Sequence, residues 1–410
     1  MRSPTLPSRF AVLAALALSG CTETSLTAPA AVPSAFAPDV VALTRTSLGP
    51  SAIWSNTITG ETKSGALYAL HMPHRWNGSV VYYAHGIVPA AAPLALPTGD
   101  GFPDVRDALG RLGYAVAYSS FSENGWAVKD GTTRTLQLRQ LFERNFDEPR
   151  RSYLVGTSMG GLIAQKIAES RAKHYDGILA MCAPLAGATA EVNYIGNVRV
   201  VFDALYPGVV PGDVLNVPPG LDLFNDVIVP VKTAITLNPT GLGIISRLAQ
   251  TPLAGESGAE LAGSLIYAIG YDVSGIDDFL GRTKGESMFD NRETWYSAAA
   301  PLPPGTVEQV NQLVGRFDAS PRGERFLDQY YNPEGDLDMP TLTLHTTRDP
   351  LVPFFHEAEF AQRVARAHHS EKLVQRSVNA YGHCAFTTEQ MVGAFQALAG
   401  WVTTGHKPAA

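Results

Sequence analysis

Three residues with the chemistry of a nucleophile, a carboxylate and a base occur along the chain in the order Ser158, Asp349, His383. Ser158 stands between glycines in "VGTSMGG" (155–161), where a strand-like run meets a helix-like run. A serine hydroxyl is a weak nucleophile at neutral pH unless a base takes its proton. Histidine suits that task because its ordinary pKa is about 6.5. A carboxylate on the other ring nitrogen would fix the tautomer. The pattern predicts acyl transfer through Ser158, with His383 as base and Asp349 as its partner.

Each assignment has an alternative. Ser158 would otherwise be an ordinary turn residue, and His383 a histidine on a surface loop. We expect the nearby His345 and His356 to pack or to face solvent. Three other acids in the same part of the chain compete with Asp349: Asp336, Asp338 and Glu357.

The anionic intermediate of acyl transfer needs N–H donors beside the nucleophile. The amide of Met159 is one candidate, because it follows the nucleophile at the start of a helix-like run. The second donor should come from the loop after "VVYYAHG" (80–86). We favour the amide of Ile87, with Gly86 as the alternative. His85 is expected to shape this loop instead of transferring protons.

Strand-like and helix-like runs alternate over most of the chain. The predicted strands are 66–72, 79–84, 114–119, 152–155, 177–182, 341–345 and 372–378. The predicted helices between them are 104–112, 134–146, 161–172, 356–368 and 389–402. This alternation predicts an α/β fold, with a mostly parallel, doubly wound sheet and helices on both faces. Ligands bind at the carboxyl edge of such sheets, where Ser158, Asp349 and His383 would meet.

The alternation lapses between residues 187 and 338, which are rich in proline and glycine. Helix-like pieces at 241–250 and 260–269 occur there, with few strand signals. The segment is too long for a loop in a compact domain. We interpret 187–338 as a largely helical cap inserted into a core formed by 46–186 and 339–410. The alternative is a second independent domain.

Four motifs occur in a fixed order, each at the end of a predicted strand: "VVYYAHG", "VGTSMGG", "RDPLVP" (348–353) and "YGHCAF" (381–386). Together they resemble the α/β-hydrolase superfamily, over roughly residues 50–186 and 339–405. The resemblance implies a serine esterase or lipase that acts on a small-molecule ester.

Two further readings stay open. A serine peptidase or amidase of the same fold could use Glu123, in "SSFSENGW" (119–126), to hold a substrate's ammonium group; a solvated loop carboxylate is the alternative. Trp126 would line the mouth of the site or pack against the cap. A surface lipoprotein that only binds its partner is the third reading, although it would have no need of three catalytic groups.

The fold that the resemblance implies brings the histidine loop back over the end of strand 177–182. A disulfide between Cys182 and Cys384 would then brace His383, and the alternative is two buried thiols. No His-Glu-x-x-His, Cys-x-x-Cys or strand-linked Gly-x-Gly-x-x-Gly pattern occurs in the sequence. We therefore expect neither a metal nor a nucleotide cofactor.

The N-terminus combines Arg2 and Arg9 with an apolar run at 10–18, which is typical of a secretory signal. The run ends in "LSGC", which resembles the lipobox of bacterial lipoproteins and implies lipidation of Cys21. We expect a signal peptide at 1–20, an Ala/Pro/Thr-rich tether at 21–45 and a lipid-anchored place in the bacterial envelope. Thr22 after the cysteine favours the outer membrane. An ordinary secretory signal would instead give a periplasmic or secreted protein.

Charge argues against nucleic acid as a partner. The formal net charge is −7, and no dense block of lysine and arginine occurs. No apolar run reaches the 18 or so residues of a membrane-spanning helix, so the lipid anchor would be the sole attachment to a membrane. The sequence does not predict the oligomeric state.

Overall fold

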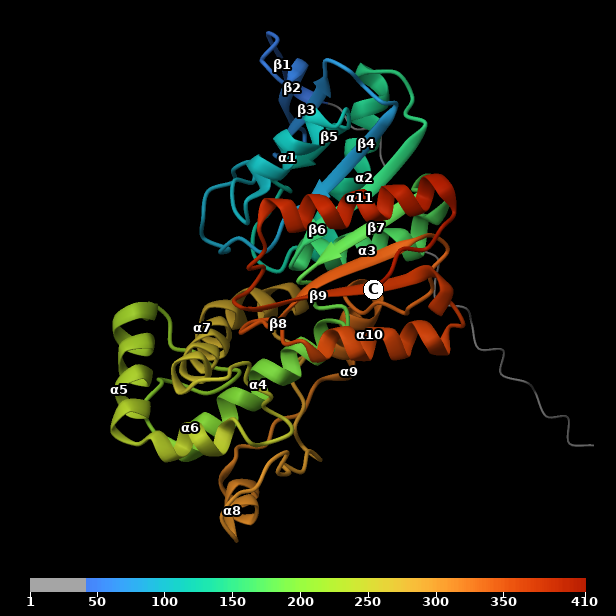
Figure 1. Cartoon of the computed structure of the whole chain (residues 1–410). Coiled ribbons are helices and arrows are strands. Elements are labelled where there is room, and N and C mark those ends of the chain that lie inside the picture. Colours follow the sequence, from blue (N-terminus) through green and yellow to red (C-terminus); the bar gives the residue numbers. More distant parts are fainter. Residues whose placement is uncertain (1–41) are drawn as a thin grey trace, which may run out of the picture.

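A computed structural model describes residues 42–410, and within that range one nine-stranded sheet has the order β1-β2-β3-β5-β4-β6-β7-β8-β9 (Figure 1). The strands are β1 (Ala42–Leu48), β2 (Trp54–Thr62), β3 (Leu67–Pro73), β4 (Ser79–Ala84), β5 (Ala115–Ser119), β6 (Arg151–Thr157), β7 (Gly177–Met181), β8 (Thr341–Arg348) and β9 (Leu373–Tyr381). Strands β1, β2, β3 and β5 pair antiparallel, and the pairs from β5 through β4 to β9 are parallel. The predicted signal peptide, Cys21 and tether residues before 42 lie outside the described residues.

Both faces of the sheet are covered by helices. The helices α1 (Phe102–Arg111) and α11 (Thr388–Thr404) pack on one face, and α2 (Val128–Asn145), α3 (Met159–Arg171) and α10 (Phe355–Arg366) on the other. Strand β4 is buried throughout, with Val80 and Tyr82 packing on the side of α2 and α3 and Val81 and Tyr83 on the side of α1 and α11. A strand covered on both faces needs a continuous apolar run, which is why β4 was visible in the sequence.

Two strands were not predicted. The segments β1 and β2 are rich in serine and threonine, and β1 is mostly exposed at the antiparallel edge. The predicted tether at 21–45 was therefore wrong in its last residues, because 42–45 belong to β1. Threonine favours strands, but a polar edge strand lacks the apolar pattern by which the other strands were recognised.

The cap helices lie between β7 and β8 and extend away from the sheet (Figure 1). They are α4 (Ala188–Leu205), the π-helical turn η3 (Leu223–Ile228), α5 (Val229–Leu237), α6 (Pro239–Ile245), α7 (Gly258–Thr283), α8 (Thr306–Leu313) and α9 (Pro321–Tyr330). Helices α4 to α8 have their own apolar core, which includes Phe202, Ile245 and Leu265. Helix α9 instead packs on the main core through Leu327. Two short 3₁₀ turns, η2 (Ala172–His174) and η4 (Ser370–Lys372), complete the chain.

The most apolar helices of the cap are short, and the chain bends sharply between them. Among residues 42–410, no single helix is long and apolar enough to cross a membrane. The segments Leu223–Leu237 and Pro239–Ile245 reach that length only as a pair, and the pair is bent by 101°. The bend lets Val231 and Ile245 reach the same cap core.

Candidate active site

Ser158 occupies the sharp corner between β6 and α3, with a left-handed backbone conformation (φ 54°). Non-glycine residues seldom adopt this conformation, which costs about 1–3 kcal/mol. The amide of Ser158 donates to the Met181 carbonyl (2.8 Å), and the Ser158 carbonyl accepts from Gly161 (2.9 Å). These bonds hold the corner, so the side chain projects from the carboxyl edge of the sheet.

The glycines around Ser158 are required by close backbone packing. A Cβ at Gly156 would collide with the Gly160 backbone, and a Cβ at Gly160 would collide with the Ala84 carbonyl. Gly161 packs against the Ala183 side chain. The "GTSMGG" pattern therefore reflects how tightly β6, α3 and the end of β4 meet.

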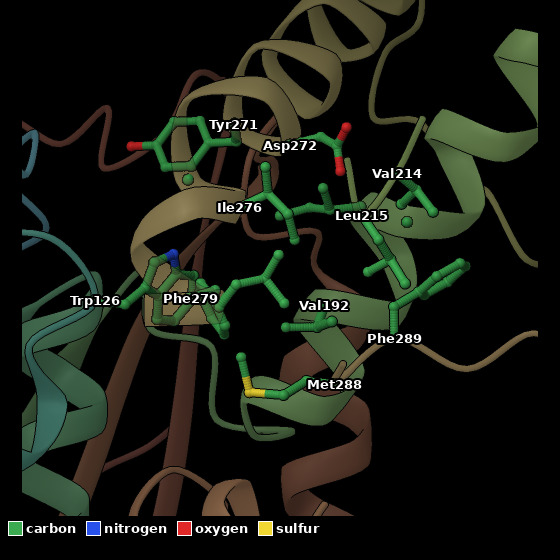
Figure 2. Close-up of a pocket in the computed structure, with 14 residues that line it drawn as sticks. Trp126, Val192, Val214, Leu215, Tyr271, Asp272, Ile276, Phe279, Met288 and Phe289 are labelled. Atoms are coloured by element: carbon green, nitrogen blue, oxygen red, sulfur yellow. The ribbon is translucent and has the colours of Figure 1, made fainter. Parts of the chain in front are cut away.

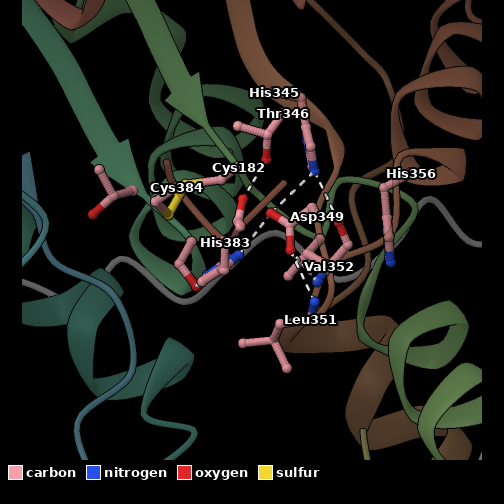
Figure 3. A network of polar contacts seen from close by, with 12 residues as sticks. Cys182, His345, Thr346, Asp349, Leu351, Val352, His356, His383 and Cys384 are labelled. Atoms are coloured by element: carbon pink, nitrogen blue, oxygen red, sulfur yellow. Dashed lines mark hydrogen bonds and ion pairs between the residues drawn. A yellow bond between two sulfur atoms is a disulfide. The ribbon is translucent and has the colours of Figure 1, made fainter. Parts of the chain in front are cut away.

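The three predicted catalytic side chains form one hydrogen-bonded chain. His383 Nε2 lies 2.9 Å from Ser158 Oγ, and His383 Nδ1 lies 2.8 Å from Asp349 Oδ2. Asp349 is fully buried, and its Oδ1 accepts from the amides of Leu351 and Val352 (both 2.9 Å; Figure 3). The carboxylate is thus fixed by its own loop and presents its second oxygen to His383.

The rival acids lie elsewhere. Glu357 is buried in the first turn of α10, where it accepts from Thr343 and Gln375. Asp336 is exposed and pairs with His369 (2.9 Å). Asp338 is exposed as well. Of the four candidate acids, Asp349 is the one bonded to His383.

His345 packs against the Asp349 loop and hydrogen-bonds to it. Its Nε2 lies 2.9 Å from the Val352 carbonyl, and its Nδ1 lies 3.2 Å from Glu357 Oε1. Burial alone would lower the pKa of His345, but the hydrogen bond to Glu357 and the charge of that carboxylate raise it above its ordinary value. This histidine therefore packs in the core, which is one of the two places that we expected for it from the sequence.

The loop that carries His383 is covalently tied to the sheet. Cys384 forms a disulfide with Cys182, which follows β7, and the two Cα atoms are 5.3 Å apart (Figure 3). Both cysteines have left-handed backbones. Thr346 Oγ1 also donates to the Gly382 carbonyl (2.7 Å). Within residues 42–410, one group of metal-type ligands converges (Cys182, His383 and Cys384), and the disulfide uses both of its sulfurs.

The predicted oxyanion donors surround the nucleophile. The amide of Met159 heads α3, where the first N–H groups have no partner within the helix. Met159 and Ile87 both line a small cavity of about 20 Å³ at Ser158. A Cβ at Gly86 would lie 3.2 Å from Ser158 Cβ, so the backbone there passes directly beside the nucleophile. Gly86 and Ile87 therefore both lie beside the nucleophile, and the amide of either could be the second donor.

His85 is buried and shapes the loop after β4. Its ring stacks on Phe121 at 3.9 Å between centroids, and its Nδ1 lies 2.7 Å from the Gly86 carbonyl. Nδ1 must donate in this bond, because a carbonyl only accepts. Burial lowers the pKa of His85, so the ring is neutral at pH 7.

The Glu123 carboxylate, which was considered for binding a substrate's ammonium group, pairs with a cation of the protein itself. Arg282 of α7 pairs with Glu123 Oε1 at 2.8 Å. The same guanidinium donates to the Asn124 carbonyl (2.6 Å) and pairs with Asp278 (2.9 Å). Glu123 therefore connects the core to the cap. The partner lies 159 residues along the chain, so no local pattern could have identified it.

Trp126 combines both of the roles considered for it. Its ring packs edge-on against Phe279 of α7, at 4.8 Å between centroids, and its amide donates to Asp278 (2.7 Å). The side chain also lines the cavity at Ser158 and an apolar cavity of about 50 Å³ inside the cap (Figure 2). It therefore forms part of the wall between nucleophile and cap.

One buried acid at the site was not predicted. Glu191, in the first turn of α4, lines the cavity at Ser158. Its Oε2 accepts from His356 Nε2 (2.8 Å), and His356 Nδ1 accepts from the Ala186 amide. Burial, then the charge of Asp349, raises the pKa of Glu191 well above its ordinary value, and burial lowers the pKa of His356 to about 3. Both shifts favour the uncharged form of each group. In the sequence, Glu191 is indistinguishable from an exposed acid at a helix start.

Among solved structures, the chain is similar to an esterase from Aspergillus oryzae, with 15% identity, 90% of this chain and 88% of that chain covered, and a TM-score of 0.51. The chain has an α/β-hydrolase fold. Feruloyl esterase B from Aspergillus oryzae aligns with 13% identity over 90% of this chain and 88% of its own, at a TM-score of 0.49. Candida antarctica lipase A aligns with 14% identity over 92% of this chain and 85% of its own, at a TM-score of 0.46. No protein-family model matches the sequence, and no curated protein matches it.

Proposed function

We propose that this protein is a serine hydrolase that cleaves carboxylic esters through an acyl-enzyme intermediate. The observation that carries the proposal is the continuous chain of hydrogen bonds from Ser158 through His383 to Asp349. A strained nucleophile corner and a bonded base are what acyl transfer requires.

The reaction follows from that geometry. Ser158 Oγ attacks the ester carbonyl carbon while its proton passes to His383 Nε2. The carbonyl oxygen becomes an oxyanion, which accepts from the Met159 amide and from the amide of Ile87 or Gly86. Collapse of the intermediate breaks the bond to the alcohol, which leaves with the proton from His383. A water then gives a proton to His383 and attacks the acyl carbon. Collapse of this second intermediate releases the acid, and His383 returns the proton to Ser158 Oγ.

Asp349 acts on the base. The buried carboxylate accepts from His383 Nδ1–H, so Nε2 is left free to take the serine proton. The negative charge stabilises the imidazolium that forms during each attack.

Neither alternative function has a specific observation in its favour. The peptidase reading depended on a free Glu123, and that carboxylate is paired with Arg282. The binding-module reading gives no reason for a base to lie 2.9 Å from Ser158 Oγ.

Turnover of p-nitrophenyl acetate and butyrate tests the proposal. The full chain should hydrolyse both esters, and Ser158→Ala should lose about 10⁶-fold in kcat, as removal of a triad serine does elsewhere. Retained circular dichroism and Tm would exclude misfolding of the variant. Equal rates on aminoacyl p-nitroanilides would favour a peptidase, and no turnover on either substrate class would contradict the proposal.

We also propose that Cys21 carries a lipid that anchors the protein to the bacterial outer membrane. The support is the lipobox-like "LSGC" after a short apolar run. Several acyl chains hold a protein at a bilayer far more firmly than one chain does. In bacteria, the unaltered protein should fractionate with membranes, and Cys21→Ala should leave membrane-bound protein strongly reduced. An unchanged distribution would contradict lipid anchoring.

A further inference from the structure

A cavity of about 530 Å³ separates the core loop after β4 from the cap. Its walls are mainly apolar, and include Ile87 and Val88 from the core and Leu223, Ile228 and Ile266 from the cap. The carboxylate in its wall, that of Asp278, is bound by Arg282 and by the Trp126 amide. The volume lies in the range of small-molecule sites, and the lining favours an uncharged, apolar group.

The large cavity adjoins the nucleophile. Ile87, Trp126 and Tyr271 line both this cavity and the small cavity at Ser158. Trp126 and Tyr271 also line the third cavity, of about 50 Å³, inside the cap (Figure 2). A carbonyl held at Ser158 would therefore have an apolar space directly beside it.

Two glycines of α7 border the large cavity, Gly270 and Gly275. Glycine destabilises a helix interior, so a glycine that is not exposed there calls for a local reason. Gly263 has one, because a Cβ there would collide with the Tyr381 hydroxyl. Gly270 is buried, yet a Cβ there would meet nothing within 4 Å. The space beside Gly270 is therefore cavity, and any larger side chain would project into it.

We propose that this cavity binds the apolar group of the ester substrate, and that Gly270 sets the size of the group it accepts. The inference rests on the proposed ester hydrolase function and specifies its substrate: an ester with an alkyl or aromatic group far larger than acetyl. The apolar group could belong to the acyl part or to the alcohol part of the ester. A matched pair of substrate series distinguishes the acyl side from the alcohol side.

The test compares chain-length preference in unaltered protein and Gly270→Leu. Each enclosed methylene should raise kcat/KM by up to about fourfold, so the unaltered protein should prefer p-nitrophenyl octanoate to acetate, or octyl acetate to ethyl acetate. Gly270→Leu should lower the preferred ratio by about tenfold or more, since its side chain takes the space of several methylenes. Gly270→Ala, which adds one carbon to open space, should lower the ratio less.

Gly281→Leu is the matched control. Gly281 lies in the same helix, is exposed, and also has nothing within 4 Å of an added Cβ. The control should leave both ratios unchanged. A lower ratio of long-ester to short-ester kcat/KM in Gly270→Leu, in one of the two substrate series, supports the inference. The series in which the ratio falls identifies the side of the ester that the cavity holds. Unchanged ratios in both series for the folded Gly270 variants would overturn it.

A binding measurement separates this inference from the proposed function. 1-Octanol, which is uncharged, should bind when titrated into the full chain, and Gly270→Leu should weaken its affinity at least severalfold. If no ester were hydrolysed but 1-octanol binding still depended on Gly270, the hydrolase proposal would fail and the cavity assignment would stand. Ester turnover with no dependence on Gly270 in either assay would reject the cavity assignment alone.

Discussion

On the core side of the active site, Ser158, Asp349 and His383 lie in short loops that are held by several backbone bonds or by a disulfide. On the cap side, α7 contacts the core near its two ends. Arg348 of β8 pairs with Glu256 beside the start of α7, and Arg282 near the end of α7 bonds Glu123 and Asn124. Between these contacts, α7 is held within the cap, where buried Asp272 pairs with Arg199 of α4 (2.9 Å), and its other face contributes cavity wall.

This difference indicates that the core and the cap have separate roles. The core loops hold the reacting atoms, and small displacements there are expensive because catalysis needs near-contact geometry. The cap wall selects the substrate, so changes there should alter preference before they alter chemistry. Variants on the two sides can therefore be told apart by whether they lower kcat for all esters or change the ratio between esters.

After the loss of Ser158 itself, the largest effect should come from changing Asp349. Asp349→Asn should reduce kcat on p-nitrophenyl butyrate by about 10⁴-fold with the fold retained, since an amide leaves His383 in the wrong tautomer. Asp336→Asn, at an exposed acid paired with His369, should leave kcat unchanged. Equal losses in the two variants would break the assignment of Asp349.

Removing the disulfide should affect both stability and activity. The Cys182→Ala/Cys384→Ala double variant should lose about 2–5 kcal/mol of free energy of unfolding, because the bridge closes a long loop of the unfolded chain. Its kcat should also fall, since Cys384 directly follows His383. Denaturant titration and steady-state assays measure the two effects. Full activity in a double variant, or in reduced protein with two titrated thiols, would show that the bridge does not position the base.

Glu191 should make stability depend on pH. Its folded pKa is raised, so it resists ionisation in the folded chain but ionises in the unfolded chain above about pH 4.5. The contribution of Glu191 to the free energy of unfolding is therefore fully present below that pH. It declines as the pH rises, by about 1.4 kcal/mol per pH unit, until the pH reaches the pKa of the folded state. The groups that act on Glu191 are His356, Asp349, His383 and His345.

Glu191→Gln isolates this effect, because the amide oxygen can still accept from His356. The difference in unfolding free energy between unaltered protein and Glu191→Gln should shift in favour of the variant as pH rises from 5 to 8. The comparison also removes most of the contribution of His356, whose lowered pKa makes stability rise with pH. Parallel stability curves would show that Glu191 is ionised in the folded protein.

The smallest effect should come from removing the contacts of Arg282 between the cap and the core. Arg282→Met should raise KM for the larger esters a few-fold and leave kcat on acetate nearly unchanged. The stability loss should be about 1–2 kcal/mol, since the half-buried guanidinium makes several hydrogen bonds, although exposed Glu123 contributes little of it. Arg322→Met, at a long and exposed contact with Glu286, is the control and should change neither. A general loss of kcat in Arg282→Met would mean that the cap also positions the catalytic groups.

The sequence predicted the parallel part of the sheet and the loops at its carboxyl edge. Strands such as β4 and β7 are buried on both faces and so carry continuous apolar runs. Sheet topology then brings Ser158, Asp349 and His383 together, although Ser158 and His383 are 225 residues apart. The antiparallel strands β1 and β2 were missed because their polar, partly exposed surfaces carry no such run.

The cap side could not be predicted in the same way. The roles of Glu191, Tyr271 and Gly270 are set by where the cap helices dock, and no local pattern distinguishes them from ordinary helix residues. The ion pair of Glu123 could not be predicted either, because its partner Arg282 comes from that same docking. A helical insertion between two strands can be recognised from composition, but its contacts depend on packing that composition does not specify.

Labelling with a fluorophosphonate tests the central claim most directly, because Ser158 Oγ would displace fluoride and retain the phosphonyl group. Peptide mass spectrometry should locate one adduct per chain at Ser158, with labelling absent in Ser158→Ala and strongly slowed in His383→Ala. An unlabelled Ser158 in protein that hydrolyses esters, or an adduct at another residue, would contradict the account.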